Sequence, residues 1–206
     1  MLTARPQNAA PLQDCPNLRA VSLSSALLDR VDAFGRCAAL EDLSLSGVLG
    51  VVDWAPLGGA EKLRRLRVHR SRLTGLGQLG TGLTSLTDLD LAGNNFLREG
   101  FGLLGNFPHL ASLNVAHSNM TGIEEMPAAH PALAFVNVSG CRFVSRESIA
   151  AYLLAAYHLT YFTYDATRAV PTVRIVTDGS VEYSMAADGG IKCTALDGLE
   201  LYRCVL

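Results

Sequence analysis

Apolar residues recur along the chain with one spacing: at repeat position one, then at positions four and six, followed by a small or polar residue at position nine. The register begins at seven leucines: Leu18, Leu40, Leu63, Leu86, Leu110, Leu133 and Leu159. Its clearest copy runs from Leu86 to Phe96 and reads LTDLDLAGNNF. Successive starts lie 22 to 26 residues apart. This periodicity predicts a stack of similar units, each packed on its neighbours.

Each unit is predicted to contain one short strand, whose side chains alternate between two faces. Positions four and six then point into the core: Val21/Leu23, Leu43/Leu45, Leu66/Val68, Leu89/Leu91, Leu113/Val115, Val136/Val138 and Phe162/Tyr164. Positions three and five point outward and line up as columns on the concave face of a parallel sheet. The return segments, rich in Gly and Pro, favour turns and 3₁₀ pieces with their own inward residues, among them Trp54, Leu103 and Leu104. Only residues 145–157 have helical spacing.

The period stops after Thr167, and the remaining residues predict four short strands at 173–176, 181–185, 191–196 and 199–205. A hairpin turn at Gly179 would pair Ile175 with Val181, and a second at Gly198 would pair Ala195 with Leu199. We therefore predict an N-terminal extension at 1–14, a solenoid at 15–167 and an antiparallel β-meander at 168–206. The meander either caps the last unit or docks a partner.

The spacing from Leu86 to Phe96 resembles the leucine-rich repeat, and the resemblance to that superfamily extends over about residues 12–167. The stretches 39–47 and 51–57 are similar to its intracellular, cysteine-containing and internalin-like types. The resemblance implies an α/β fold, a right-handed solenoid of about seven repeats with a concave parallel sheet, and a protein-binding role without catalysis. Position nine, usually Asn, reads Ala26, Val48, Ser71, Asn94, Ser118, Cys141 and Thr167. Its side-chain hydrogen-bond ladder is therefore expected to be mostly missing.

Composition narrows the class of partner. The chain has 206 residues, 49% of them apolar, and a net charge of −2, which argues against general nucleic-acid binding. No apolar run suits a secretory signal or a membrane span, so we expect an intracellular and not a secreted protein, cytoplasmic in the first place, with an axonemal or organellar assembly as alternatives. The five cysteines follow the repeat and not a disulfide framework. Cys15 and Cys37 are expected to fill the core.

The outward columns supply the candidate binding residues. Arg65 and Arg67 belong to an arginine-rich strand that alone would suggest a phosphate site, but Asp42 and Asp88 are predicted beside Arg65 and Asp90 beside Arg67. A self-neutralised charge ladder is favoured. Phe135 and Tyr161 share one column, either as an interface anchor or as residues covered by the C-terminal strands. The predicted protein-binding residues are Arg65, Arg67, Asp88, Asp90, Asn114, Phe135, Asn137 and Tyr161.

No candidate catalytic or metal-binding residues emerge, and no cofactor is predicted. The five histidines have no metal-ligand spacing, and the sequence contains no nucleophile elbow, P-loop or Cys-x-x-Cys motif. We predict a non-enzymatic scaffold, a small structural subunit of a larger intracellular assembly with protein partners and with neither nucleic acid nor membrane. A transient adaptor that recruits clients is one alternative, and a ligand-binding or enzymatic site in the C-terminal β-module is another. Self-association stays open.

Overall fold

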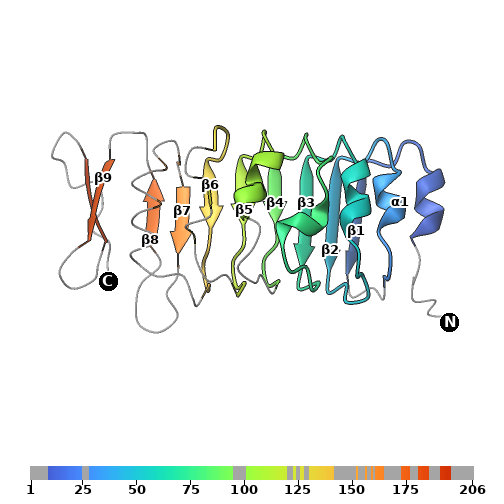
Figure 1. Ribbon diagram of the computed structural model, residues 1–206, viewed down its shortest axis with the longest axis horizontal. Helices are drawn as coiled ribbons and strands as arrows, with labels where there is room; N and C mark the ends of the chain where they lie inside the picture. The colour runs from blue at the N-terminus through green and yellow to red at the C-terminus, as the bar shows by residue number, and fades with distance from the viewer. Residues whose placement is uncertain are drawn as a thin grey trace.

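The structure is a computed structural model that describes residues 9–24, 28–94, 101–119, 123, 126–127, 130–141, 152, 156, 159, 161–164, 173–176, 181–185 and 191–195. The elements follow one another along the long axis of the molecule (Figure 1). Those of the first half, with 3₁₀ helices written η, are η1 (Ala10–Asp14), β1 (Ala20–Ser24), α1 (Asp32–Gly35), β2 (Asp42–Ser46), η2 (Ala55–Gly59), β3 (Arg65–His69), η3 (Leu76–Leu79) and β4 (Asp88–Asp90). The others are η4 (Phe101–Asn106), β5 (Ser112–Asn114), β6 (Phe135–Asn137), β7 (Tyr161–Tyr164), β8 (Val173–Val176), β9 (Val181–Met185) and β10 (Ile191–Ala195).

The strands β1 to β7 lie side by side in sequence order, and each pairs in parallel with the next (Figure 1). The register joins the same repeat position at every step, so Leu43 lies beside Leu66 and Leu66 beside Leu89. A shift of one residue would turn every apolar side chain of a strand toward solvent. The sequence period and the sheet register therefore agree, and the predicted parallel sheet is confirmed.

The inward positions form one continuous apolar core. From β2 to β6, the residues at positions four and six are all buried: Leu43, Leu45, Leu66, Val68, Leu89, Leu91, Leu113, Val115, Val136 and Val138. Val21 and Leu23 of β1 are only partly buried, since β1 is the first strand of the sheet and packs on one neighbouring strand. Phe34, Trp54 and Phe107 fill the space between the sheet and the return segments. Burial of such large side chains is the main contribution to stability.

The return segments are short, as predicted, and mostly 3₁₀. Proline stands in the first turn of η1 and η2, where its missing N–H costs nothing. One inward assignment was wrong: Leu103 is 41% exposed, whereas Phe101 and Leu104 are buried. The reason is the period of three residues per turn in η4, which places positions 101 and 104 on one side and 103 outside. Of the predicted helix at 145–157 the structure describes Tyr152 and Ala156, which are both buried. The backbone N–H of Ala156 donates a hydrogen bond to the carbonyl oxygen of Tyr152 at 2.9 Å.

The C-terminal strands pair differently from the prediction. Ile175 lies opposite Phe162, because β8 pairs antiparallel with β7, and Val181 lies opposite Ala195, because β9 pairs antiparallel with β10 in a separate sheet. The Gly179 hairpin is therefore wrong. An open parallel sheet ends in a strand with unpaired backbone groups, and β8 satisfies those of β7. The second predicted hairpin involves residues 196–206, outside the described part, and the role of these strands as a cap or docking module stays a prediction.

Within the part of the chain that the structure describes, no helix has the length and apolarity needed to cross a lipid bilayer.

Candidate functional site

The outward residues of β2 to β6 form a surface that we call the open face. It consists of positions three and five: Asp42, Ser44, Arg65, Arg67, Asp88, Asp90, Ser112, Asn114, Phe135 and Asn137. The register places the position-three residues in one row and the position-five residues in the next. The predicted columns are thus present, and the Cα atom of Tyr161 is paired with that of Phe135. The side chain of Tyr161 lies outside the described residues.

One half of the open face is charged. Arg65 Nε donates to Asp42 Oδ2 at 2.7 Å, and Arg67 Nη1 donates to Asp42 Oδ1 at 3.4 Å. The contact with Asp42 raises the pKa of the Arg65 guanidinium. Both arginine side chains are about half exposed, so these ion pairs contribute little to stability and remain accessible to a partner.

The predicted placement of Asp90 beside Arg67 is confirmed, since their Cα atoms are paired across β3 and β4, but the Arg67 guanidinium contacts Asp42. Asp90 Oδ1 instead accepts the N–H of Ala92 at 3.1 Å and lies 2.9 Å from Nε2 of His69. The carboxylate of Asp88 accepts the hydroxyl of Thr87 at 2.7 Å. Because Asp90 is held by its own turn, Arg67 reaches back to Asp42. The charge ladder is present, and its arginine–aspartate contacts lie between β2 and β3.

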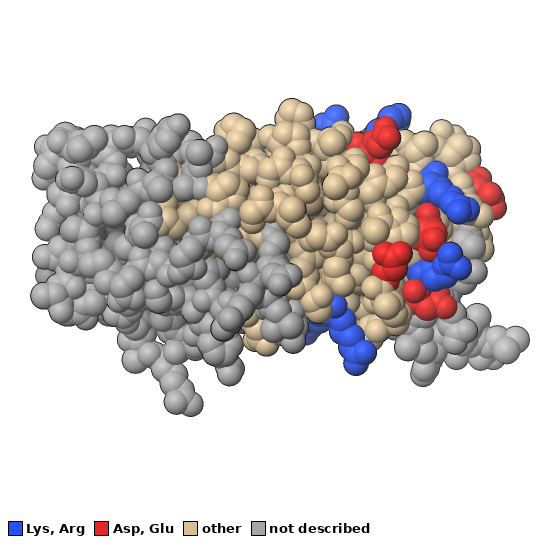
Figure 2. Space-filling model, in the orientation of Figure 1, with Lys and Arg blue, Asp and Glu red and all other residues tan. Residues whose placement is uncertain are grey.

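The other half of the open face is neutral. Among the described residues from Leu91 to Cys141 there is no Asp, Glu, Lys or Arg. Figure 2 shows charged side chains gathered at the end of the molecule that carries α1 and β1 to β3. The neutral half of the open face consists of Ser112, Asn114, Phe135 and Asn137, all half-buried.

Asn114 and Asn137 have a structural role that the sequence prediction missed. The side-chain oxygen of Asn114 accepts the N–H of Ala116 at 3.1 Å, and that of Asn137 accepts the N–H of Ser139 at 2.9 Å. Asp90 makes the same bond, so three successive strands end in an Asx turn at position five. The Nδ2 groups of both asparagines pair with no acceptor in the described part of the chain, and they are the donors that this half offers to a ligand.

The Asx turns explain why the strands differ in length. In β4, β5 and β6 position five is Asp or Asn, and each strand ends there after three residues. In β2 and β3 position five is Ser44 or Arg67, and each strand is five residues long. A sequence signal existed: Asp or Asn at the last outward position of an apolar-polar alternation favours a turn.

Position eight of the repeat has a left-handed backbone in five successive units. The φ angles are +67° at Gly47, +48° at Arg70, +73° at Gly93, +55° at His117 and +69° at Gly140. Glycine adopts this conformation without cost, whereas Arg and His do not. The larger residue covers the next glycine: a Cβ on Gly93 would lie 2.9 Å from Cγ of Arg70, and one on Gly140 would overlap the ring of His117.

We expect Arg70→Gly to raise the free energy of unfolding by about 0.5–1 kcal/mol, because glycine relieves the left-handed strain at φ +48°. The matched control is Arg36→Gly, another exposed arginine, whose φ is −92° and whose replacement should destabilise. The midpoint of urea unfolding measures both. A lower midpoint for Arg70→Gly would show that its packing on Gly93 outweighs the strain.

Position nine carries more hydrogen bonds than expected. Ser71 Oγ accepts the N–H of Val48 at 3.1 Å, and Asn94 Oδ1 accepts the N–H of Ser71 at 2.8 Å. Cys141 Sγ lies 3.2 Å from the carbonyl oxygen of Val115 and donates to it. A serine hydroxyl and a thiol thus replace the missing asparagines in part, since both are small hydrogen-bonding groups that fit under the loop.

The described thiols and imidazoles do not form a reactive centre. Burial raises the pKa of Cys141 to about 11 and also raises that of Cys37, so both remain thiols at neutral pH. Cys15 is exposed, and its assignment to the core was wrong. His130 is buried with Nε2 3.1 Å from the carbonyl oxygen of Phe107. Among the described residues no three His, Cys, Asp or Glu side chains lie close enough to hold a metal ion.

No protein-family model matches this sequence, and a search of the curated proteins found no match. Solved structures do resemble it. Internalin C2 of Listeria monocytogenes is 24% identical, with a TM-score of 0.64 over 76% of this chain and 66% of that one. A leucine-rich repeat protein of Leptospira interrogans is 19% identical, with a TM-score of 0.58 over 79% of this chain and 46% of that one.

The chain has the leucine-rich repeat fold. A third similar structure is the ectodomain of the plant membrane receptor kinase GASSHO1/SCHENGEN3 from Arabidopsis thaliana, solved in complex with CASPARIAN STRIP INTEGRITY FACTOR 2. It is 20% identical, with a TM-score of 0.52 over 76% of this chain and 19% of that one. The matched region therefore spans about two thirds or less of each of these structures. The leucine-rich repeat fold is typical of protein–protein interaction modules, and such modules are generally not enzymes.

Proposed function

We propose that this chain is a non-enzymatic scaffold that binds a protein partner through the open face, the face that the sequence predicts to be concave. The observation that carries the proposal is the division of this face into a charged half on β2 to β4 and a neutral half on β5 and β6. A face with only a structural role would need no such division. The receptor kinase ectodomain, which has the same fold and was solved with a bound factor, supports the choice of a binding role.

The charged half would orient the partner. Asp42, Arg65 and Arg67 form a compact group in which acidic and basic atoms are both partly exposed. Such a group attracts a surface with the complementary arrangement of charges and repels others. Its contribution is mainly to the association rate, and it falls with rising salt because the pairs are solvent-accessible.

The neutral half would hold the partner. Phe135 is half-buried and its Cα atom is paired with that of Ser112, while Asn114 and Asn137 form the adjacent row on the same side of the sheet. A large aromatic side chain with amide donors around it is the composition of an interface hot spot, because the aromatic buries area and the donors satisfy polar groups of the partner. Tyr161 extends the row by one strand in the predicted site.

The role of a permanent subunit in an intracellular assembly belongs to the same proposal. Cys37 and Cys141 are free thiols, which suits a reducing compartment such as the cytoplasm. A transient adaptor would have the same fold, and the two roles differ in stoichiometry. Affinity purification from the native source with mass spectrometry separates constant, stoichiometric partners from variable clients.

The sharpest test uses Asn114→Asp. An aspartate keeps the side-chain oxygen that accepts the Ala116 N–H, so the Asx turn survives, but it replaces the exposed NH₂ donor by an acceptor. We expect the partner recovered with the wild-type chain to bind Asn114→Asp and Phe135→Ala at least about tenfold more weakly in a titration calorimeter.

The control is Leu103→Ala, which removes an exposed leucine on η4, away from the open face. This variant should bind within about twofold of the wild type, a difference below 0.5 kcal/mol. Equal binding by all four proteins would remove the open face from the proposal. A loss in Leu103→Ala alone would move the site to the return segments.

A further inference from the structure

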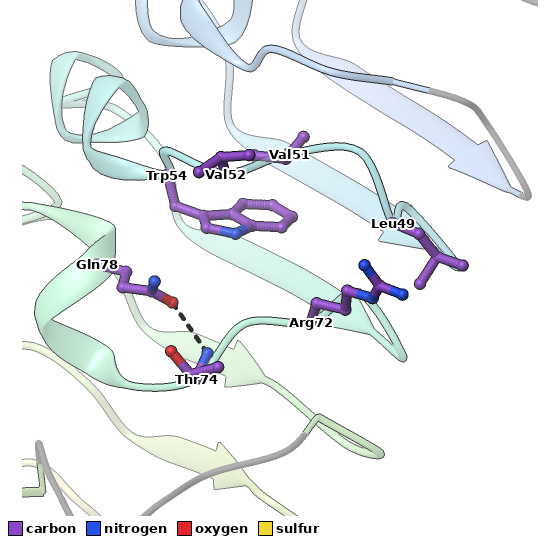
Figure 3. Close-up of a pocket in the computed structure, with 7 residues that line it drawn as sticks. All are labelled: Leu49, Val51, Val52, Trp54, Arg72, Thr74 and Gln78. Carbon is purple, nitrogen blue, oxygen red and sulfur yellow. Dashed lines mark hydrogen bonds between the residues drawn. The ribbon is translucent and has the colours of Figure 1, made fainter.

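A second concave site lies outside the open face, between the loop that follows β2 and the loop that follows β3. The depression has a volume of about 450 Å³. Leu49 lies beside Arg72 at one end and Val52 lies beside Val51 at the other, with Trp54 at the floor between them (Figure 3). None of these residues belongs to the sheet.

Two of its lining residues are apolar and exposed without an evident structural reason. Val52 is 86% exposed and Leu49 is 49% exposed, and among the described residues only Leu103 is a further exposed large hydrophobic. Trp54 is 1% exposed, so the floor is closed and the pocket does not open into the core. Exposed aliphatic side chains that gather at one depression mark a binding surface more often than single ones do.

Arg72 is held at the rim by the backbone around it. The N–H groups of Ser71 and Leu73, on either side of Arg72, both donate to the side-chain oxygen of Asn94, at 2.8 and 3.3 Å. This clamp keeps Arg72 in a left-handed conformation with φ +57°, which a residue other than glycine adopts at a cost. The guanidinium is exposed and forms no ion pair with any described residue. A strained, fixed loop that presents an unpaired cation is preorganised for an anion.

Gln78, which lines the pocket together with Thr74, also offers a hydrogen-bond donor. Gln78 Oε1 accepts the N–H of Thr74 at 2.9 Å, as Figure 3 shows, and this bond leaves the NH₂ group of Gln78 as the donor. The pocket therefore combines an aliphatic wall with two kinds of donor. A complementary ligand has a bulky aliphatic group next to an acceptor, and a carboxylate satisfies a guanidinium best because two parallel hydrogen bonds form.

We propose that this pocket binds a short extended segment of a partner protein in which a bulky aliphatic side chain stands within two residues of an acidic one. The aliphatic side chain packs against Leu49 and Val52 above the indole of Trp54, and the carboxylate pairs with Arg72. This site is separate from the open face and adds a second point of contact. A partner that binds both sites would have a higher overall affinity, because its second contact forms within the same complex.

The test begins with selection of a phage-displayed random heptapeptide library on the immobilised full-length chain. We expect the recovered peptides to be enriched in Asp or Glu within two residues of Leu, Ile, Val or Met. A selected peptide is then titrated in solution, with the fluorescence of Trp54 as the signal, since it is the only tryptophan of the chain. Changing the peptide's acidic residue to its amide should weaken binding at least about tenfold.

Variants of the chain locate the site. Arg72→Gln and Val52→Ser should each weaken peptide binding at least about tenfold. Arg64→Gln, which replaces an exposed arginine elsewhere in the same repeat, should leave the affinity for the peptide within about twofold of the wild type. All three residues are exposed, so their unfolding midpoints should match the wild type. Failure to enrich any peptide, equal binding by Arg72→Gln, or peptides without an acidic residue would overturn the proposal. Loss of peptide binding in Phe135→Ala alone would place the peptide on the open face and would also overturn the proposal.

Discussion

Asn94→Ala is expected to lower the free energy of unfolding by at least about 3 kcal/mol. Asn94 is buried, and its oxygen accepts the N–H groups of Ser71 and Leu73 at 2.8 and 3.3 Å. Its NH₂ group donates to the carbonyl oxygen of Leu91 at 2.9 Å and also to that of Val68. Alanine would leave these backbone groups buried without partners, and each such group costs about 1–3 kcal/mol.

The matched control is Ser118→Ala, at the same position nine one repeat later. Ser118 is equally buried, but its hydroxyl has no hydrogen-bond partner among the described residues. Its removal should leave stability unchanged or raise it, since an unpaired buried hydroxyl costs free energy. Chemical unfolding followed by far-UV circular dichroism measures both variants. Equal losses in the two would show that position nine contributes by volume and not by hydrogen bonding.

Asn94→Ala has a consequence for the pocket as well. The clamp on Ser71 and Leu73 fixes the backbone of Arg72, so its loss would free the guanidinium from its position at the rim. The variant should bind the selected peptide more weakly at temperatures where it is still folded.

Gly82→Ala is expected to destabilise the protein by about 3 kcal/mol, the second large effect. The return segments stack so closely that a Cβ on Gly82 would overlap the carbonyl oxygen of Gly58 and lie 2.8 Å from its carbonyl carbon. Both atoms belong to the backbone, so no side-chain rotation relieves the clash. Adjacent segments would have to move apart, and the apolar contacts of Leu57 and Leu83 beneath them would weaken.

Gly102→Ala provides the comparison, because a Cβ there meets no atom within 4 Å. This substitution should be neutral or slightly stabilising, since alanine loses less backbone entropy on folding. Thermal unfolding of the two variants under the same conditions is the measurement. A Gly82→Ala protein as stable as Gly102→Ala would mean that the stacked segments separate without cost, contrary to the close packing of the return segments.

The order of the strands, their parallel register and the division into inward and outward residues were predictable from the sequence alone. The physical reason is that one period links all three: if Leu43, Leu66 and Leu89 each face the core, parallel neighbours must align them. The outward rows of the candidate site follow directly, because side chains alternate along a strand. The placement of Asp42 and Asp88 on either side of Arg65 needed no further information.

The Asx turns at Asp90, Asn114 and Asn137 could have been predicted, since they depend on residues two apart. The left-handed position eight also had a signal, in the glycines that occupy it at 47, 93 and 140. Neither is visible in a pattern that records only apolar and polar residues. Both features are local, and turn chemistry would have revealed them.

What the sequence by itself determined is the apolar register and, through it, a parallel sheet with a defined outward surface. Only the tertiary structure decided which acid Arg67 contacts, which edge β8 covers, and whether Leu49 and Val52 border a pocket. These outcomes depend on groups in different strands or loops that compete for the same neighbour. Periodicity specifies which face a residue occupies, but the choice among neighbours on that face is made by packing and hydrogen bonding in three dimensions.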